Sequence, residues 1–506
     1  MNKKRALILL AGIIVLGIAL RVPRFFSIIP AAGVVDSKII WYDEAVSIYF
    51  AEQNIADTVT LSGLDTSPCL FFILLHFWLL IVGTGSAVLM ALLPFFFSVA
   101  SIVAIFILGK DIRDENTGLL SALFMAMSPL NIQYATEIRA YSLLVFIAVF
   151  FLLFLWRSIQ KGETRHYLGL IVSTLLLLYT HYSAIALIIP GYLALLYYKR
   201  AEIKDIIACV AAVAIGYIPA LYVFQRWGDF FSAGSGSFYG RFYSHGGIVA
   251  FFQYLYSIVF GAIGNNAAPV LLSFFILAFL YYFWRRSGRD KRDFLVVLVI
   301  AGFVVLSVGK MIYHERYFIV LTVPVILILA LAARNIKVKS LVLPLLVSTL
   351  FFILFIFPAY ATVYNRAFKY YAPSFARVIQ NNWQEGDMVI ADHYNQVLMP
   401  RYLPVADKIK LFFPFNGELI DDPAVRWRYS DFPIINDGNV FLVDELTTGS
   451  ARFWVVGHNG DSVEDPHGAL SKYLGRKYTL IATYYFPTGL SLNDLVTELR
   501  LYRTSR

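Results

Sequence analysis

Long apolar runs dominate the first 358 residues of this chain of 506. Runs of about 17–23 residues recur between residues 6 and 358, and each is long enough to cross roughly 30 Å of hydrocarbon as a helix. Only 15% of the residues are charged, whereas soluble domains usually carry about 25%. The sequence therefore predicts a polytopic α-helical membrane protein.

Lys and Arg in the short loops predict the topology, because such loops are enriched in these residues on the cytoplasmic side. The dense clusters are Lys3–Arg5, Lys110 with Arg113, Arg157–Arg165, Lys199–Lys204, Arg285–Arg292 and Arg334–Lys339. If all are cytoplasmic, an even number of crossings separates each pair. The runs 69–83 and 248–264 are short and aromatic, contain His76 and Gln253, and are predicted to lie at the interface or re-enter. About 11 spans remain, with a cytoplasmic N-terminus in the cell membrane and an extracytoplasmic C-terminal domain.

The composition changes after Tyr360, where Asp, Asn, Gly and Pro become frequent and apolar runs shorten to strand length. We therefore predict a transmembrane domain over 1–359, with a first outer loop over 23–85, and a soluble α/β domain over 360–506. The pattern at 373–392 indicates a helix followed by the strand Met388–Ala391. Further strands are expected at 408–412, 439–443, 452–456, 478–486 and 499–504, with a helix near 466–474.

The net charge of +9 does not indicate nucleic-acid binding. Residues 359–506 carry 15 Lys and Arg against 16 Asp and Glu, so the excess lies in the loops between spans. The two cysteines, Cys69 and Cys209, lie in apolar surroundings and provide neither a disulfide framework nor a thiol metal site.

The polar stretch 36–68 holds an acidic pair, Asp43 and Glu44, and a third acid, Asp65, between two apolar runs. Transfer chemistry on a hydroxyl needs a carboxylate that accepts its proton, so Asp43 is the candidate general base. The alternative is a solvated loop that caps the next helix.

A second polar stretch reads SPLNIQYATEIRAYSLL over 128–144 and interleaves Tyr134, Glu137 and Arg139. Arg139 presents a fork of donors suited to a lipid phosphate, although Glu137 and Arg139 pairing with each other is the simpler interpretation.

Two further outer positions carry polar groups. His181 and Tyr182 end the span 167–181, where a histidine is often only a packing residue, and YHERYF over 313–318 offers Arg316 as a phosphate anchor.

The chain resembles the GT-C membrane glycosyltransferases in the order of its motifs. These are the DE pair, DTSP before an aromatic segment, SP…YATEIRAYSLL, THY and ERY…P. It is most similar to the protein O-mannosyltransferase and aminoarabinose transferase type. The resemblance covers roughly residues 1–360 and implies transfer of a sugar from a polyprenyl-phosphate donor to a protein, lipid or polysaccharide hydroxyl at the outer face, with inversion. It implies Asp43 as general base with Glu44 beside it. It implies substrate-binding roles for Asp65, Tyr134, Glu137, Arg139, His181, Tyr182 and Arg316.

This chain departs from the family at Thr66-Ser67-Pro68-Cys69, where relatives often show His-Pro-Pro. Phosphate recognition therefore depends on Arg139, His181 and Arg316. No cofactor is required, and a divalent metal is not indicated because the donor carries a single phosphate.

Two other classes remain open. A transporter or flippase of lipid-linked sugars would show internal repeats, and none is found. A non-catalytic membrane protein that binds an envelope polymer would work without Asp43.

Overall fold

The computed structural model of the chain describes residues 3–29, 34–64, 67–221, 293–308, 315–335, 371–412, 414–415, 418–419, 435–458, 468–486 and 497–504. The chain folds as two compact units. The membrane unit comprises residues 1–25 and 66–364, and the sheet unit comprises residues 26–65 and 365–506. The domain boundary between residues 359 and 360 stays a prediction.

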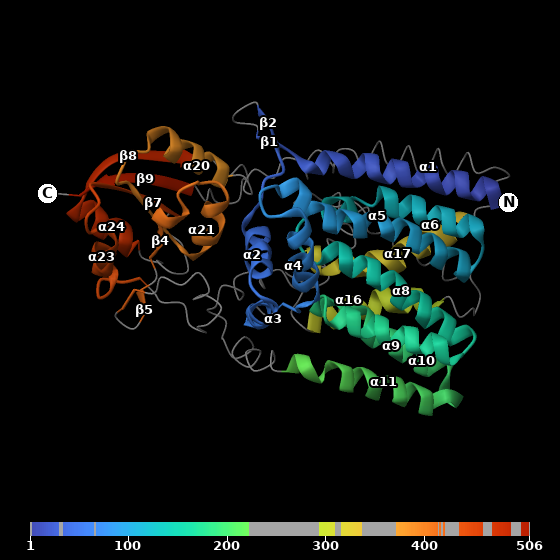
Figure 1. Cartoon of the computed structure of the whole chain (residues 1–506). Coiled ribbons are helices and arrows are strands. Elements are labelled where there is room, and N and C mark those ends of the chain that lie inside the picture. The colour runs from blue at the N-terminus through green and yellow to red at the C-terminus, as the bar shows by residue number, and fades with distance from the viewer. Residues whose placement is uncertain are drawn as a thin grey trace. The chain divides into compact units, whose positions relative to one another are not determined.

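The membrane unit is built of apolar helices that run side by side (Figure 1). They are α1 (Lys3–Arg21), α4 (Leu70–Val82), α5 (Ala87–Ile112), α6 (Glu115–Met127), α7 (Pro129–Gln133), α8 (Tyr141–Gln160), α9 (Thr164–Leu178), α10 (Ile185–Tyr198), α11 (Ile203–Tyr217), α16 (Phe294–Val308) and α17 (Thr322–Asn335). Short 3-10 turns, η1 (Val22–Phe25), η2 (Tyr182–Ala184), η3 (Arg200–Glu202) and η7 (Glu315–Leu321), begin or end several of them.

Five helical stretches within the described ranges are long and apolar enough to cross a membrane. They are Lys4–Phe25, Ala87–Ile112, Tyr141–Gln160, Arg200–Leu221 and Arg316–Arg334. The prediction of several apolar spans is therefore confirmed. The total of 11 is not tested, because residues 222–292 and 336–370, including the segment 248–264, lie outside the described residues.

The predicted segment 69–83 forms the helix α4, which has 13 residues. At about 1.5 Å per residue it is about 20 Å long, shorter than the hydrocarbon core of a bilayer. Its interfacial location stays a prediction.

Helices α5 and α6 pack closely because glycines face each other. A Cβ added to Gly109 would lie 3.0 Å from the Cα of Gly118, and one added to Gly118 would lie 2.6 Å from the carbonyl oxygen of Phe106. Small residues allow such backbone approach between membrane helices.

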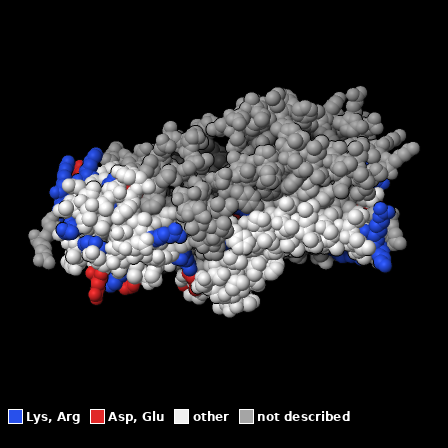
Figure 2. Space-filling model, turned by 90° about the horizontal axis from the view of Figure 1, so that it is seen from above, with Lys and Arg blue, Asp and Glu red and all other residues white. Residues whose placement is uncertain are grey.

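Three of the predicted cytoplasmic clusters meet at one end of the membrane unit. Arg157 at the end of α8 binds Asp111 (3.0 Å), and Arg334 at the end of α17 binds Asp114 (3.2 Å). Lys199 pairs with Glu202 (2.6 Å), which also accepts a hydrogen bond from the Tyr167 hydroxyl (2.5 Å). Figure 2 shows Lys and Arg gathered at this end, beside a flank of the unit that carries little charge.

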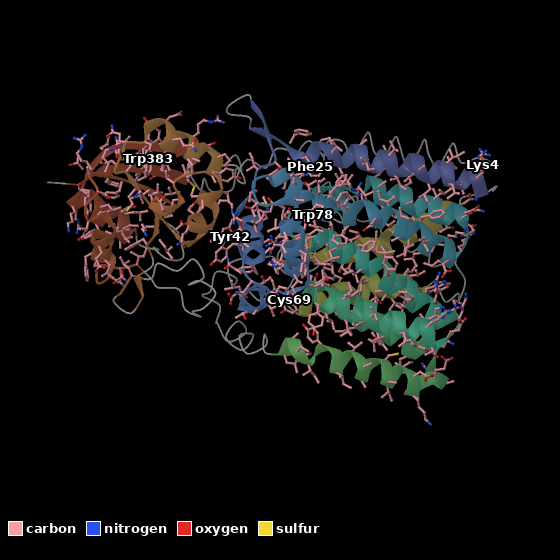
Figure 3. All side chains as sticks on the ribbon, viewed as in Figure 1. Lys4, Phe25, Tyr42, Cys69, Trp78 and Trp383 are labelled. Carbon is pink, nitrogen blue, oxygen red and sulfur yellow. The ribbon has the colours of Figure 1, made fainter. Side chains whose placement is uncertain are left out.

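The end of α1 near Phe25, opposite the end at Lys4 (Figure 3), buries an arginine completely. Arg21 donates to the carbonyl oxygens of Ala126 (2.9 Å) and Met125 (3.2 Å) at the C-terminus of α6, and to the hydroxyl of Ser98 (2.8 Å). A cation at a helix C-terminus satisfies the last carbonyls and the helix dipole. Arg21 therefore fixes the end of α1 against the C-terminus of α6 and the middle of α5.

The sheet unit contains a five-stranded sheet of order β4-β3-β7-β9-β8. Its strands are β3 (Met388–Ala391), β4 (Ile409–Leu411), β7 (Arg452–His458), β8 (Thr479–Phe486) and β9 (Thr497–Arg503); β5 (Pro414–Phe415) and β6 (Glu418–Leu419) pair separately. Strands β4, β3 and β7 are parallel, whereas β7, β9 and β8 are antiparallel. The helices of this unit are α2 (Tyr42–Glu52), α3 (Ile55–Leu64), α20 (Tyr371–Asn382), α21 (His393–Leu398), α23 (Val443–Thr447) and α24 (Ala469–Lys477), and the hairpin β1 (Phe26–Ile29) and β2 (Val34–Ser37) precedes α2.

The prediction of a mixed helix-and-strand C-terminal region is confirmed, with one error. The predicted strand at 439–443 is helical, with the 3-10 turn η12 (Val440–Leu442) leading into α23. Asn436 starts the turn: its backbone N–H donates to the Asn439 side chain (2.9 Å), and its carbonyl accepts from the Val440 N–H (3.0 Å). Val440, Leu442 and Val443 still reach the core. The apolar run was correctly expected to be buried, but five residues are too few to distinguish a strand from a turn of helix.

Candidate active site

The acidic pair lies in the first turn of α2, within the sheet unit. Glu44 is buried, and its carboxylate makes an ion pair with Lys38 (2.6 Å), whose side chain is only 8% exposed. The other carboxylate oxygen accepts the backbone N–H of Trp41 (3.2 Å), so Glu44 closes the start of the helix. Glu44 thus has a structural use for both of its oxygens, and Lys38, which sequence reasoning missed, is its partner.

Asp43 is half-buried and comes one residue earlier on the same turn. The first turn of a helix favours negative charge, because its N–H groups point toward the N-terminus. The backbone carbonyl of Asp43 accepts the Ser47 hydroxyl (2.9 Å), which secures this turn. Asp43 is therefore held on a regular helix rather than on an irregular loop, whereas Asp65 lies outside the described residues.

In the membrane unit, the stretch after Ser128 folds into the one-turn helix α7 and a compact turn that leads into α8. Pro129 opens α7, a position where its missing N–H costs nothing. The turn is tied to the end of the first span, because Arg24 donates to the carbonyl of Gln133 (3.1 Å) and accepts at its own carbonyl from Thr136 (3.3 Å). Glu137 is buried and Arg139 is half-buried beside it.

Four rings from three segments of the membrane unit form a continuous row. Tyr134 contacts Tyr141 (4.9 Å between ring centroids), Tyr141 contacts His181 (5.6 Å) and His181 contacts Tyr317 (5.4 Å). The guanidinium of Arg316 lies over the ring of Tyr317, 5.5 Å from its centroid. Tyr134, His181 and Arg316, which the sequence singled out at distant positions, are therefore brought together.

His181 is the centre of this row. Its Nδ1 accepts the backbone N–H of Ser183 (3.1 Å), which a nitrogen carrying a proton cannot do. The imidazole is accordingly neutral, with its proton on Nε2 as a donor. The charges of both Arg139 and Arg316 act on this ring, so the three side chains form one electrostatic group.

The remaining predicted residues are distributed as follows. Tyr182 opens η2 beside His181 and is half-buried. Tyr141 and Tyr317 were not predicted as site residues, although both stand within the motifs SPLNIQYATEIRAYSLL and YHERYF. The roles of all these residues stay predictions. Across the ranges that the structure describes, no group of three or more His, Cys, Asp and Glu side chains could hold a metal.

Residues 65–223 match the family described as dolichyl-phosphate-mannose-protein mannosyltransferase. Among solved structures, the chain is similar to ArnT from Cupriavidus metallidurans bound to undecaprenyl phosphate, with 12% identity, 99% of this chain and 98% of that chain covered, and a TM-score of 0.61. The apo form of that protein gives 12% identity, coverage of 98% and 97%, and a TM-score of 0.60. AglB from Archaeoglobus fulgidus in complex with an inhibitory peptide and a dolichol-phosphate gives 12% identity, coverage of 98% and 76%, and a TM-score of 0.51.

Among curated proteins, none matches this sequence. The structural matches establish an ArnT-like fold, that of a multi-pass helical membrane protein with a C-terminal region of mixed sheet. The resemblance to the GT-C glycosyltransferases is confirmed, and the family match agrees with the predicted class of enzyme.

Proposed function

From the match of residues 65–223 to a family of polyprenyl-phosphate-sugar glycosyltransferases, we propose that this chain is itself such an enzyme. It takes a sugar from a polyprenyl-phosphate donor and transfers it to an acceptor hydroxyl on the outer face of the cytoplasmic membrane. The acceptor belongs to a protein, a lipid or a polysaccharide.

One observation carries this proposal: His181 and Arg316 come from separate segments of the membrane unit and both contact the ring of Tyr317, and the charge of Arg139 also acts on His181. The leaving group of the reaction is a phosphate monoester whose negative charge grows as the sugar departs. Two guanidinium groups and a neutral Nε2–H match that charge with hydrogen-bond donors, which stabilise it in the transition state. A transporter of sugars would not need hydrogen-bond donors matched to a growing phosphate charge.

Asp43 acts as the general base. The acceptor oxygen attacks the anomeric carbon of the sugar, its proton passes to the Asp43 carboxylate, and the bond from the anomeric carbon to the phosphate oxygen breaks. Polyprenyl phosphate leaves with the electron pair, and this single displacement inverts the anomeric configuration. Glu44, bonded to Lys38 and to the Trp41 N–H, orients this turn of α2.

The N-terminus is cytoplasmic and the C-terminal domain extracytoplasmic. This orientation is supported by the Lys and Arg clusters gathered at one end of the membrane unit, around Arg157 and Arg334. The ring row of His181 belongs to the opposite ends of the same helices, since α8 begins at Tyr141 and ends at Gln160.

The test is sugar transfer by the purified full chain in lipid nanodiscs. The donors are undecaprenyl phosphates that carry radiolabelled mannose, glucose, galactose or aminoarabinose, and the acceptors come from an extract of the cell envelope. Asp57→Asn is the matched control, because Asp57 is an exposed carboxylate on the neighbouring helix α3. Transfer by the wild type and by Asp57→Asn, but not by Asp43→Asn, is expected. Movement of a labelled lipid across the bilayer without transfer would instead favour the transporter.

A further inference from the structure

We propose that the C-terminal domain positions the general base, and that Arg401 and Tyr402 are the positioning residues. This inference depends on the proposed role of Asp43 and assigns the C-terminal domain a part in the same reaction. Its basis is a set of contacts that are internal to the sheet unit.

The first contact fixes the entry to α2. The Tyr402 hydroxyl accepts the backbone N–H of Ile40 (2.7 Å) and donates to the carbonyl of the same residue (2.6 Å). Ile40 lies two residues before α2 begins, and Asp43 is the second residue of that helix. One phenol thus satisfies both backbone groups of a buried residue that lies three positions from the base.

The second contact fixes the other end of the helix. Arg401 makes two parallel hydrogen bonds to the Glu52 carboxylate, of 2.7 and 2.6 Å, and Glu52 is the last residue of α2. The side chains of this ion pair are 16% and 29% exposed, so water screens it only in part. A bidentate pair constrains direction as well as distance.

Tyr402 is itself held in place within the C-terminal domain. The Tyr402 N–H donates to the carbonyl of Met399 (2.9 Å), and its own carbonyl accepts from the Gln380 side chain of α20 (3.0 Å). Met399 and Leu403 on either side are buried. Arg401 and Tyr402 therefore hold α2 at both ends, and a shift of the C-terminal segment that carries them would move Asp43.

An ordinary packing role would make Arg401 matter only for stability. Positioning predicts a different result: loss of turnover with unchanged donor affinity, since the donor phosphate contacts lie in the membrane unit. A charge swap separates the two, because Arg401→Glu with Glu52→Arg rebuilds the pair in reverse.

The experiment measures kcat and the donor KM of the full chain in nanodiscs, with whichever labelled undecaprenyl-phosphate sugar the wild type uses. Hydrogen exchange of the α2 amides is measured in parallel and does not require activity. We expect Arg401→Glu and Glu52→Arg each to lower kcat about tenfold, as is typical of broken contacts between neighbours, with KM unchanged and faster exchange in α2. The double variant should recover most of the wild-type kcat and most of the wild-type protection of α2 from exchange. Tyr402→Phe should give a smaller loss of kcat.

Arg476→Glu is the matched control, because it makes the same charge change at an exposed site on α24. Wild-type kcat in Arg401→Glu, or no recovery in the double variant, would overturn the positioning role. Failure of the proposed function looks different: Asp43→Asn would retain transfer, while α2 would still exchange faster in Arg401→Glu.

Discussion

The two groups of candidate residues are held in different ways. In the membrane unit, Tyr134, Tyr141, His181 and Tyr317 are ordered by ring contacts between segments far apart in the sequence. On α2, the acidic pair is ordered by ion pairs and backbone hydrogen bonds, through Lys38, Arg401 and Tyr402. Ring packing tolerates small changes in shape, whereas a buried charge that loses its partner is costly. The comparison predicts that the acidic pair, which includes the proposed base Asp43, is more sensitive to substitution than the rings.

The largest effect is expected at the proposed base, Asp43. Asp43→Asn keeps the shape and removes the proton acceptor, so kcat should fall by about 10² to 10⁴. Rates are to be measured across donor concentrations, with the exchange of α2 amides as proof of an intact helix. A rise in KM with unchanged kcat would instead assign Asp43 a role in binding.

The next effect concerns the buried ion pair. Glu44→Gln leaves the Lys38 charge without its carboxylate and should destabilise α2 by about 3 kcal/mol, which hydrogen exchange of the helix measures. Adding Lys38→Met should restore most of the protection, because the charge is then gone as well. A double variant as unstable as Glu44→Gln would show that the pair is not the cause.

The third-largest effect is expected at Arg316, whose guanidinium lies over the ring of Tyr317. Arg316→Lys keeps the charge but loses the planar fork, so the donor KM should rise about tenfold with kcat less affected. Arg476→Lys, on an exposed face of α24, serves as the reference. Equal KM values for Arg316→Lys and Arg476→Lys would show that Arg316 does not bind the donor phosphate.

The smallest effect is expected for a ring. Tyr317→Leu removes one ring–ring contact, worth about 0.5–1.5 kcal/mol, and should raise the donor KM by roughly threefold to tenfold. Tyr485→Leu on β8 is the control, since Tyr485 is 64% exposed. A larger loss than that of Arg316→Lys would mean that the rings contact substrate directly, and the contrast between the two groups would then disappear.

The sequence predicted the parts of the fold that depend on local patterns. Among the apolar runs expected between residues 6 and 358 are the long helices α5 and α8, and the predicted strand Met388–Ala391 is β3, because hydrophobic length and period determine such elements locally. The error at 439–443 arose where a turn closed by the Asn439 side chain, which accepts the Asn436 N–H, determined the backbone; this signal is weaker than the apolar run beside it.

The candidate site residues could be selected by residue type, but their partners in the structure could not. Arginine, histidine and acid near span ends are costly, so their presence indicated function. Residue type does not identify their partners: Lys38 lies only six residues before Glu44 but carries no motif that marks it, and Ile40 and Tyr402 are 362 residues apart. The row of rings was visible only as scattered tyrosines.

The long separation in sequence between Ile40 and Tyr402 also affects the order in which the sheet unit folds during synthesis. Residues 26–65 leave the ribosome long before the residues with which they fold, since 362 positions separate Ile40 from Tyr402. At about 5–20 residues per second, synthesis of the intervening chain takes roughly 20 to 70 s. During that interval α2 has neither of its C-terminal anchors, so Asp43, the proposed base, takes its final position only after synthesis has passed Arg401 and Tyr402.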